Sequence, residues 1–324
     1  MDSWDYKLYS NQLYKVPDVV FKIEINTSLC ADKLPISDEI ENNHLKWLND
    51  SKFYGDVPVT NTLNSLVPYI YSFLPEKYII PMYRVVDWVT IFDDLVLENK
   101  NYTPEYLESI FNRNAIHDHF GKSYWKILDE FDNIDVPREL MNDIMRKYVK
   151  SIIKSFSVNL RDSTFNEYFK IRRKTSGSKV FLSTFLLDLK CNNIASTIMV
   201  NPLVERLCIL ISNCNSLLND LYSFVKEFQS EEYDNYVKVL CYQLTKDLTY
   251  PYTTDIIQTS MNKIKDIIES SYEEAAEIGE LIKNHSEWNQ EEHTILEIIL
   301  KRIYESAYGH ILTYKNTFRY ISNH

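Results

Sequence analysis

Two oxygen-rich stretches, far apart in a chain of 324 residues, have the composition and spacing of a site for a hard metal ion. In the second stretch Asn219, Ser223 and Glu227 recur at every fourth position, so on an α-helix their side chains project from one face. Amide, hydroxyl and carboxylate oxygens suit a small divalent cation such as Mg²⁺. Because Mg²⁺ is usually completed by water and substrate phosphate, this stretch predicts a diphosphate ligand.

The first stretch is a group of three carboxylates at the end of an apolar run. Residues 83–92 contain neither Gly nor Pro and are mostly apolar, which predicts a largely buried helix. Asp94 and Glu98 are four residues apart, while Asp93 points about 100° away around a helix, so the arc is broad enough for more than one ion. Like charges this close raise each other's pKa unless a cation neutralises them. The alternative is an acidic helix end solvated on the surface.

The elements that must position these residues are predicted to be helices throughout. Gly is scarce, at 5 residues, and hydrophobic residues make up 45% of the chain. Scarce Gly argues against a turn-rich sandwich or barrel and against a glycine-rich phosphate loop. Since nothing resembles a linker, we predict one all-α domain over residues 1–324, with residues 1–36 as an extended N-terminal arm.

Apolar periodicity and helix-start signals place the main helices. We expect helices at 79–98, 104–113, 121–132, 137–160, 165–173, 202–228, 254–284 and 289–318. The 202–228 stretch is apolar enough to be a central helix, and the oxygen stripe lies at its far end. A Thr-Ser-Gly-Ser interruption at 175–178 separates two helical segments.

Charge and cysteine usage exclude several classes of protein. The formal net charge of −11 opposes binding to nucleic acid or to an anionic membrane surface. The first residues show no basic region followed by an apolar run, and no stretch approaches the roughly 18 apolar residues of a membrane span, so we expect a cytoplasmic protein. The five cysteines are scattered, which indicates reduced thiols rather than disulfides or zinc. His117-Asp118-His119 fits a polar loop better than a metal site.

The order and spacing of the two stretches resemble the class I terpene synthases, in particular the single-domain microbial and amoebal type, over roughly residues 80–320. The aspartate-rich motif of that family, Asp-Asp-x-x-(x)-Asp/Glu, is matched by Asp93 to Glu98. Its second motif, Asn-Asp-x-x-Ser-x-x-x-Asp/Glu, is matched without exception by Asn219 to Glu227. The two matches stand in the family's order, 126 residues apart, which makes a chance coincidence rare.

The resemblance implies further site residues. In the family an arginine 46 residues before the second motif senses the diphosphate, and Arg173 has that place. Gly177 matches the helix break whose carbonyl faces the ionising carbon. Lys226 and the Arg319-Tyr320 pair match residues that contact the diphosphate. By charge run alone, Arg173 would be a surface arginine and Arg319-Tyr320 a frayed tail.

Two positions depart from the family's pattern. Ser176 stands before Gly177 where many relatives have an acid, so the coupling of diphosphate binding to helix movement is expected to differ in detail. Thr313-Tyr314 occupy the region in which many relatives carry a tryptophan, and Tyr314 is a candidate substitute.

The implied activity is the metal-dependent ionisation of a prenyl diphosphate by a carbon–oxygen lyase. Three Mg²⁺ ions, which Mn²⁺ could replace, would be held by the two motifs, while Arg173, Lys226 and Arg319 neutralise the leaving group. The carbocation would then cyclise or rearrange to a terpene hydrocarbon or alcohol in a closed apolar cavity at the centre of the helical bundle. Phe92 and Trp88 are candidate wall residues because aromatic faces stabilise cations, although both could equally be core aromatics.

Substrate and alternatives follow from the same resemblance. Farnesyl diphosphate is expected on family grounds, which implies a sesquiterpene synthase, as a monomer or a homodimer. A prenyl diphosphate synthase, which elongates chains, uses two aspartate-rich motifs, whereas the second motif here is Asn219, Ser223 and Glu227. A noncatalytic helical interaction protein would require these residues and Arg173 to have been placed by accident.

Overall fold

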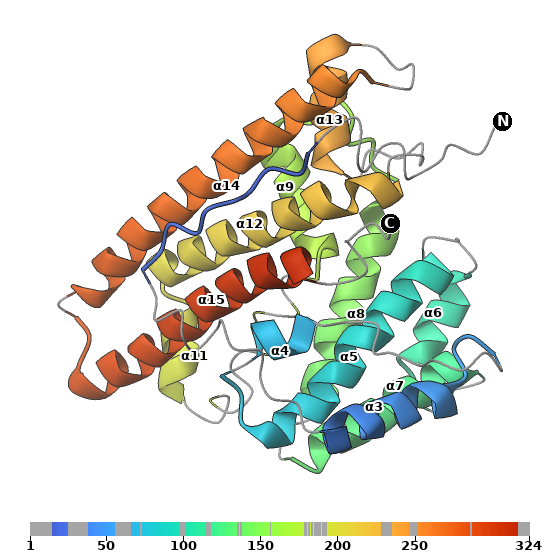
Figure 1. Ribbon diagram of the computed structural model, residues 1–324. Coiled ribbons are helices and arrows are strands. Elements are labelled where there is room, and N and C mark those ends of the chain that lie inside the picture. The colour runs from blue at the N-terminus through green and yellow to red at the C-terminus, as the bar shows by residue number, and fades with distance from the viewer. Residues whose placement is uncertain are drawn as a thin grey trace, which may run out of the picture. The chain divides into compact units, whose positions relative to one another are not determined.

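The computed structural model describes residues 15–24, 38–55, 66–71, 73–97, 102–113, 118–134, 136, 138–155, 157–177, 180, 182, 184, 189, 193–227, 235–246, 252–285 and 287–316. All secondary structure elements in these ranges are helices, as Figure 1 shows, so the all-α prediction is confirmed. The chain packs into two compact units, unit 1 (Met1–Asn26 and Lys154–His324) and unit 2 (Thr27–Ile153). A single domain over the whole chain stays a prediction.

Unit 2 is organised around helix α5, which continues without a break into the π-helical turn η3. Helices α3, α4 and α7 pack on α5, and α6 packs on α7. The elements of this unit are α3 (Asp38–Ser51), α4 (Leu66–Ile70), η2 (Glu76–Tyr78), α5 (Ile79–Phe92), η3 (Asp93–Leu97), α6 (Pro104–Ile110), α7 (His119–Asp132) and most of α8 (Arg138–Ser155). An apolar, largely buried helix ending at the aspartates is as predicted.

The start of α7 explains the polar residues around position 118. The Asp118 side chain accepts a hydrogen bond from the backbone N–H of Gly121, which satisfies a donor of the first helical turn. Its other oxygen accepts from the Tyr106 hydroxyl at 2.6 Å. Asp118 is therefore the N-cap of α7 and His119 its first residue, so the predicted polar loop is wrong at His119, while His117 lies outside the described residues.

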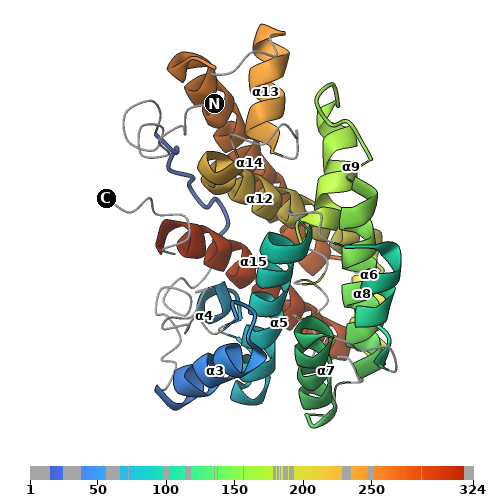
Figure 2. The ribbon, with the colours of Figure 1, turned by 90° about the vertical axis from the view of Figure 1, so that its right-hand side faces the viewer.

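Unit 1 surrounds helix α12 (Pro202–Glu227), a helix of 26 residues. Helices α9, α11, α13, α14 and α15 all contact it, and Figure 2 shows α9, α13 and α14 around it. Burial from several directions leaves side chains such as Leu207, Ile211 and Leu218 without exposed surface. The other helices of this unit are α9 (Phe165–Thr175), α11 (Asn193–Met199), α13 (Tyr236–Thr245), α14 (Thr254–Lys283) and α15 (Gln290–Asn316).

The N-terminal arm is extended over residues 15–24 and lies beside α14 in Figure 1. Its backbone N–H groups at Lys15 and Val20 donate to the side chains of Gln258 and Glu269 on α14. The side chains of Val19 and Ile23 are buried in the core of unit 1. The arm is thus held by hydrogen bonds to α14 and by its alternate apolar residues.

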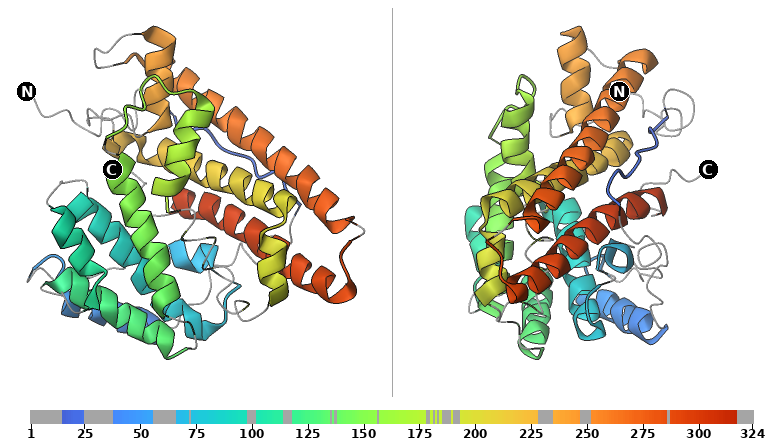
Figure 3. Two further views of the ribbon diagram at one scale, coloured as in Figure 1. Left: turned by 180° about the vertical axis from the view of Figure 1, so that it is seen from behind. Right: turned by 90° about the vertical axis from the view of Figure 1, so that its left-hand side faces the viewer.

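Two helices of unit 1 are absent from the sequence prediction, and the predicted helix over 137–160 ends early, at Ser155. The missing helices are α11 and α13. In α13 residues 236–241 are all buried, so no polar face marks its periodicity. Helices α14 and α15, both of which the sequence predicts, follow each other along the chain (Figure 3).

In the described part of the chain, only one bent pair of helices has the length and composition of a membrane span. In the described part of the chain no single helix is long and apolar enough to span a membrane, and only Asn193–Met199 with Pro202–Phe224, bent by 71°, passes together by length and composition.

Candidate metal centre

The predicted oxygen stripe lies on the last two turns of α12. Asn219 and Glu227 are half-buried, and Ser223 is 4% exposed. Among the described residues the Ser223 hydroxyl has no hydrogen-bond partner. A buried hydroxyl without a partner is costly, and here it stands one turn from an amide and one turn from a carboxylate. This donor set, with an unused oxygen at its centre, fits a hard divalent cation.

Asp220, next to Asn219, uses both carboxylate oxygens in hydrogen bonds that link α12 to α9 and α13. Its Oδ1 accepts from the Arg172 guanidinium at 2.7 Å, and its Oδ2 accepts from the Tyr168 hydroxyl at 2.7 Å and the Tyr236 backbone N–H at 3.1 Å. Asp220 is fully buried, and its contacts link α12 to α9 and to the start of α13. It is therefore a structural residue of the motif rather than a ligand.

The electrostatics of this buried pair favour a charged arginine. Burial by itself lowers the pKa of the Arg172 guanidinium, but the nearby Asp220 charge and Tyr168 oxygen raise that pKa well above its usual value. Burial raises the pKa of the Asp220 carboxyl, and the charge of Arg172 with the hydrogen bonds from Tyr168 and Tyr236 opposes that rise. The same guanidinium reaches Asn219, whose Oδ1 accepts from it at 2.7 Å.

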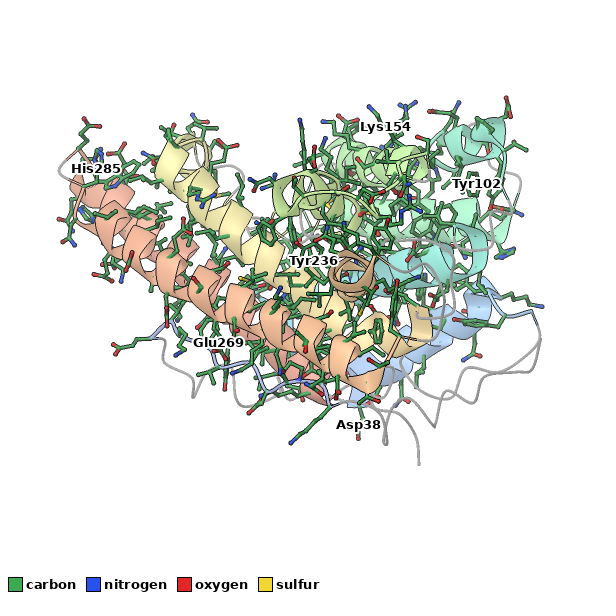
Figure 4. The ribbon with its side chains drawn as sticks, turned by 90° about the horizontal axis from the view of Figure 1, so that it is seen from above. Asp38, Tyr102, Lys154, Tyr236, Glu269 and His285 are labelled. Carbon is green, nitrogen blue, oxygen red and sulfur yellow. The ribbon has the colours of Figure 1, made fainter. Side chains whose placement is uncertain are left out.

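The other end of the stripe is held by the start of α13, where Figure 4 labels Tyr236. The Asn235 side-chain amide donates to Glu227 Oε2 at 2.8 Å and to the Asp220 carbonyl at 2.7 Å. Its own oxygen accepts from the Val237 N–H and caps α13. Lys238, fully buried, donates from Nζ to the Glu227 carbonyl at 3.3 Å. A cation at this helix end is favourable for the helix dipole.

The aspartate-rich stretch adopts a geometry that differs from the predicted α-helix. Asp93 and Asp94 are half-buried and lie in the π-helical turn η3, whereas Glu98 lies outside the described residues. A π turn bonds residue i to residue i+5, and such turns are frequent at functional sites. The arc of Asp93, Asp94 and Glu98 and its metal role stay predictions.

Trp88 and Phe92 are both about 1% exposed and pack within unit 2. Their rings are stacked, with centroids 4.7 Å apart, and the Trp88 indole N–H donates to the Phe120 carbonyl at 3.1 Å. Tyr124 of α7 tilts against Trp88 at 5.0 Å. These contacts fasten α5 to α7, as expected for core aromatics, and the role of the two rings as cavity walls stays a prediction.

Arg173 and Gly177 lie where α9 ends. Arg173 is half-buried, and no described residue gives it a hydrogen bond or an ion pair. Burial lowers the pKa of its guanidinium, and the like charge of Arg206 adds to the effect. Helix α9 stops at Thr175, and Gly177 has a φ of 73°, a left-handed conformation that glycine adopts without strain. The predicted helix break is present, while the roles of Arg173 and Gly177 stay predictions.

For three further predicted site residues, the side chain lies outside the described part of the structure. Arg319 and Tyr320 lie outside the described residues, and the Lys226 side chain is not described. Tyr314, the candidate cavity aromatic, is buried and stacks on Tyr222 with centroids 5.4 Å apart. Within the described ranges no three His, Cys, Asp or Glu side chains gather as a metal cluster. The α12 stripe instead combines one carboxylate with an amide and a hydroxyl.

Two residues around the site escaped the sequence analysis, namely Arg172 and Asn235. In the sequence Arg172 belongs to a basic run at the end of α9. Only its ion pair with the buried Asp220 shows that its side chain points toward α12. The signal for Asn235 was a helix-capping asparagine before an apolar run, which marks the start of α13. Arg172 and Asn235 contact Asp220 across 48 and 15 residues of sequence, and no local sequence pattern predicts contacts over such separations.

Comparison with known protein families identifies the family of this chain. Residues 84–274 match the model of terpene synthase family 2, C-terminal metal binding, which is more than half of the chain. The chain therefore belongs to the terpene synthase family, as a class I member, and is an enzyme of the terpene synthase type. The match includes η3, α9 and α12, the elements that carry most of the predicted site.

Curated relatives and solved structures agree with this assignment. Terpene synthase 6 of Dictyostelium purpureum is 28% identical, over 87% of this chain and 86% of its own length. Terpene synthase 7 of the same organism is 25% identical, over 97% and 95%. Among solved structures, cucumene synthase superposes with a TM-score of 0.67 at 12% identity, covering 92% of this chain and 100% of its own. Germacradien-4-ol synthase from Streptomyces citricolor gives 0.63 at 14%, covering 86% and 95%. These structures share the class I terpenoid cyclase fold.

Proposed function

We propose that this protein is a Mg²⁺-dependent sesquiterpene synthase that ionises farnesyl diphosphate and converts the carbocation to a terpene hydrocarbon or alcohol. The observation that carries the proposal is the α12 stripe, in which the buried Ser223 hydroxyl has no described partner between Asn219 and Glu227. The family to which the chain belongs binds divalent metal and implies a prenyl diphosphate substrate.

The proposed ligands are divided between two motifs. Asn219, Ser223 and Glu227 would hold metal from α12, and Asp93, Asp94 and Glu98 would hold it from the end of α5. The bound ions would neutralise the charge that develops on the diphosphate as it leaves. The buried Asp220, which accepts hydrogen bonds from α9 and α13, fixes how α12 is turned relative to those two helices, so that the stripe is presented in one direction.

Arg173 is proposed to bind the diphosphate directly. It is half-buried, it has no acidic partner among the described residues, and the like charge of Arg206 disfavours its own charge. An anion relieves both effects, and a guanidinium binds phosphate oxygens in a bidentate manner. Lys226, Arg319 and Tyr320 are proposed to complete the contacts to the leaving group.

Trp88, Phe92 and Gly177 have proposed roles near the reacting carbon. The backbone carbonyl of Gly177, at the left-handed end of α9, would face the ionising carbon, while Trp88 and Phe92 would contribute aromatic walls. Exclusion of water from such a cavity prevents early capture of the cation.

The test is incubation of the purified protein with prenyl diphosphates of ten, fifteen and twenty carbons, with Mg²⁺ and with EDTA. We expect volatile terpenes and released diphosphate with Mg²⁺ and the fifteen-carbon substrate, and neither with EDTA. Longer prenyl diphosphates as products, after addition of isopentenyl diphosphate, would indicate chain elongation instead. The absence of any turnover would contradict an active synthase.

A further inference from the structure

We propose that two residues outside the motif, Arg172 and Asn235, are positioning residues that orient the two terminal oxygens of the α12 metal stripe. Arg172 would fix the Asn219 amide, and Asn235 would fix the Glu227 carboxylate. The inference rests on the proposed function, because it assigns a role toward the metal that the stripe would bind.

The Arg172 contacts are directional. Nη2 donates to both Asn219 Oδ1 and Asp220 Oδ1, each at 2.7 Å, and Nε donates to Asp220 Oδ1 at 3.0 Å. With a side chain 13% exposed and anchored on a fully buried carboxylate, the guanidinium has little freedom to turn. The Asn219 amide is thereby held with its oxygen, rather than its nitrogen, at a fixed position. Metal coordination needs that oxygen.

Asn235 acts in the same way at the other end. Its amide nitrogen donates to Glu227 Oε2 and to the Asp220 carbonyl, while its oxygen is used by the cap of α13. Since Asn235 is completely buried, its orientation is set by three hydrogen bonds, and the Glu227 carboxylate is fixed in turn. The Asn235 donor thereby fixes the direction in which the Glu227 carboxylate is presented.

The Ser223 hydroxyl indicates that the α12 stripe binds a ligand. The two oxygens that flank it each accept a hydrogen bond from outside the motif, whereas the buried Ser223 hydroxyl has no partner in the described part of the chain. If the stripe served only helix packing, we would expect the buried Ser223 hydroxyl to have a hydrogen-bond partner, as Asn219 and Glu227 do. Donors that orient metal ligands in this way commonly contribute 10- to 100-fold to metal affinity.

Arg173 is excluded from this role by its position on α9. Arg172 and Ser176 are four residues apart and face α12, where Ser176 and Ser216 hydroxyls lie 2.8 Å apart. Arg173 is one residue further along the helix than Arg172 and points about 100° away from that face. The two neighbouring arginines thus have separate tasks, Arg172 toward the ligands and Arg173 toward the substrate anion.

The test is Mn²⁺ binding to the purified full chain with inorganic diphosphate, measured by the electron paramagnetic resonance signal of free Mn²⁺. Arg172→Lys keeps a charge for Asp220 but cannot bridge to Asn219, and Asn235→Ser keeps a capping oxygen but loses the donor to Glu227. We expect each variant to weaken Mn²⁺ binding about 10- to 100-fold.

A matched control separates orientation from general stability. Tyr168→Phe removes one hydrogen bond to Asp220 without touching Asn219 or Glu227, so Mn²⁺ affinity should stay within about twofold while the melting temperature falls. In turnover assays Arg172→Lys should raise the Mg²⁺ concentration for half-maximal rate and recover most of kcat at saturating Mg²⁺. A purely structural role would lower kcat at every Mg²⁺ concentration.

The outcomes distinguish this inference from the function on which it rests. If the wild type binds Mn²⁺ and the two variants bind it equally well, or if Tyr168→Phe is as impaired as they are, the positioning roles are overturned and the proposed function stands. If the wild type binds no Mn²⁺, both are overturned. Circular dichroism verifies folding, and if Arg172→Lys fails to fold, Asn235→Ser decides.

Discussion

The two predicted metal motifs are held by different kinds of contact. Behind the aspartate-rich turn, α5 is fastened by aromatic rings, with Trp88 stacked on Phe92 and both packed on α7. The α12 motif is instead surrounded by hydrogen bonds, with Asp220 receiving donors from α9 and α13. Aromatic packing fixes where a helix lies, whereas hydrogen bonds also fix how a side chain turns. The α12 motif is therefore expected to be the more pre-organised of the two.

The largest effect should come from the ligands themselves. Asn219→Ala and Asp93→Ala each remove a proposed metal ligand, and we expect diphosphate release from farnesyl diphosphate to fall on the order of 100- to 1,000-fold. The far-ultraviolet circular dichroism spectrum should remain helical in both. Turnover near the wild-type rate in either variant would remove that residue from the metal site.

The buried Arg172–Asp220 pair between α9 and α12 should contribute most to the stability of the motif's surroundings. Asp220→Ala leaves the Arg172 guanidinium buried without its main partner, and we expect a loss of about 3–5 kcal/mol in the free energy of unfolding. Asp162→Ala, which breaks an exposed pair with Arg161, should cost less than about 1 kcal/mol. Urea denaturation measures both. Equal losses in the two variants would show that the Asp220 contacts are not a special support of the motif.

Acid should weaken unit 1 through His310 on α15. Burial lowers the pKa of His310 from 6.5 to about 4, and its hydrogen bond to the Ser306 carbonyl opposes the shift. Between these values the unfolded chain binds the proton and the folded chain does not, so stability is lost as the pH falls from 6.5 to about 4, by about 3 kcal/mol. In His310→Asn this loss should vanish from urea titrations. A pH profile identical to that of the wild type would contradict the buried neutral histidine.

A smaller loss of activity is expected when Arg173, the proposed substrate contact next to Arg172, is changed. Arg173→Lys replaces a planar fork by a point charge, and we expect at least about a tenfold loss in kcat/KM for the diphosphate substrate. The free energy of unfolding should change by less than about 0.5 kcal/mol, because no described residue pairs with Arg173. Lys174→Arg, at an exposed position on the same helix, is the control. Unchanged kinetics in Arg173→Lys would refute the sensor role.

The sequence predicts the fold and the motifs better than it predicts their surroundings. Apolar periodicity places α5, α12, α14 and α15, because each is long and has a continuous buried face. The spacing of Asn219, Ser223 and Glu227 needs only helical geometry and holds in the structure.

What the sequence does not predict depends on contacts between distant residues. The π turn over Asp93–Leu97 stands where the sequence predicts a continuing α-helix, and no local composition marks such a turn. Arg172 and Arg173 are the same residue type in one charge run, and only the position of Asp220 tells which of them faces α12. Helix α13 has no polar face over its first turns, so its periodicity is hidden.

The central claim is that Asn219, Ser223 and Glu227 on α12 ligate a divalent metal ion that also binds the diphosphate. The most direct measurement is a crystal structure with Mn²⁺ and inorganic diphosphate, in which anomalous scattering locates the ions. We expect an Mn²⁺ ion within about 2.0–2.6 Å of oxygens from Asn219, Ser223, Glu227 and the diphosphate. Mn²⁺ bound elsewhere, with no ion at the α12 stripe, would contradict it.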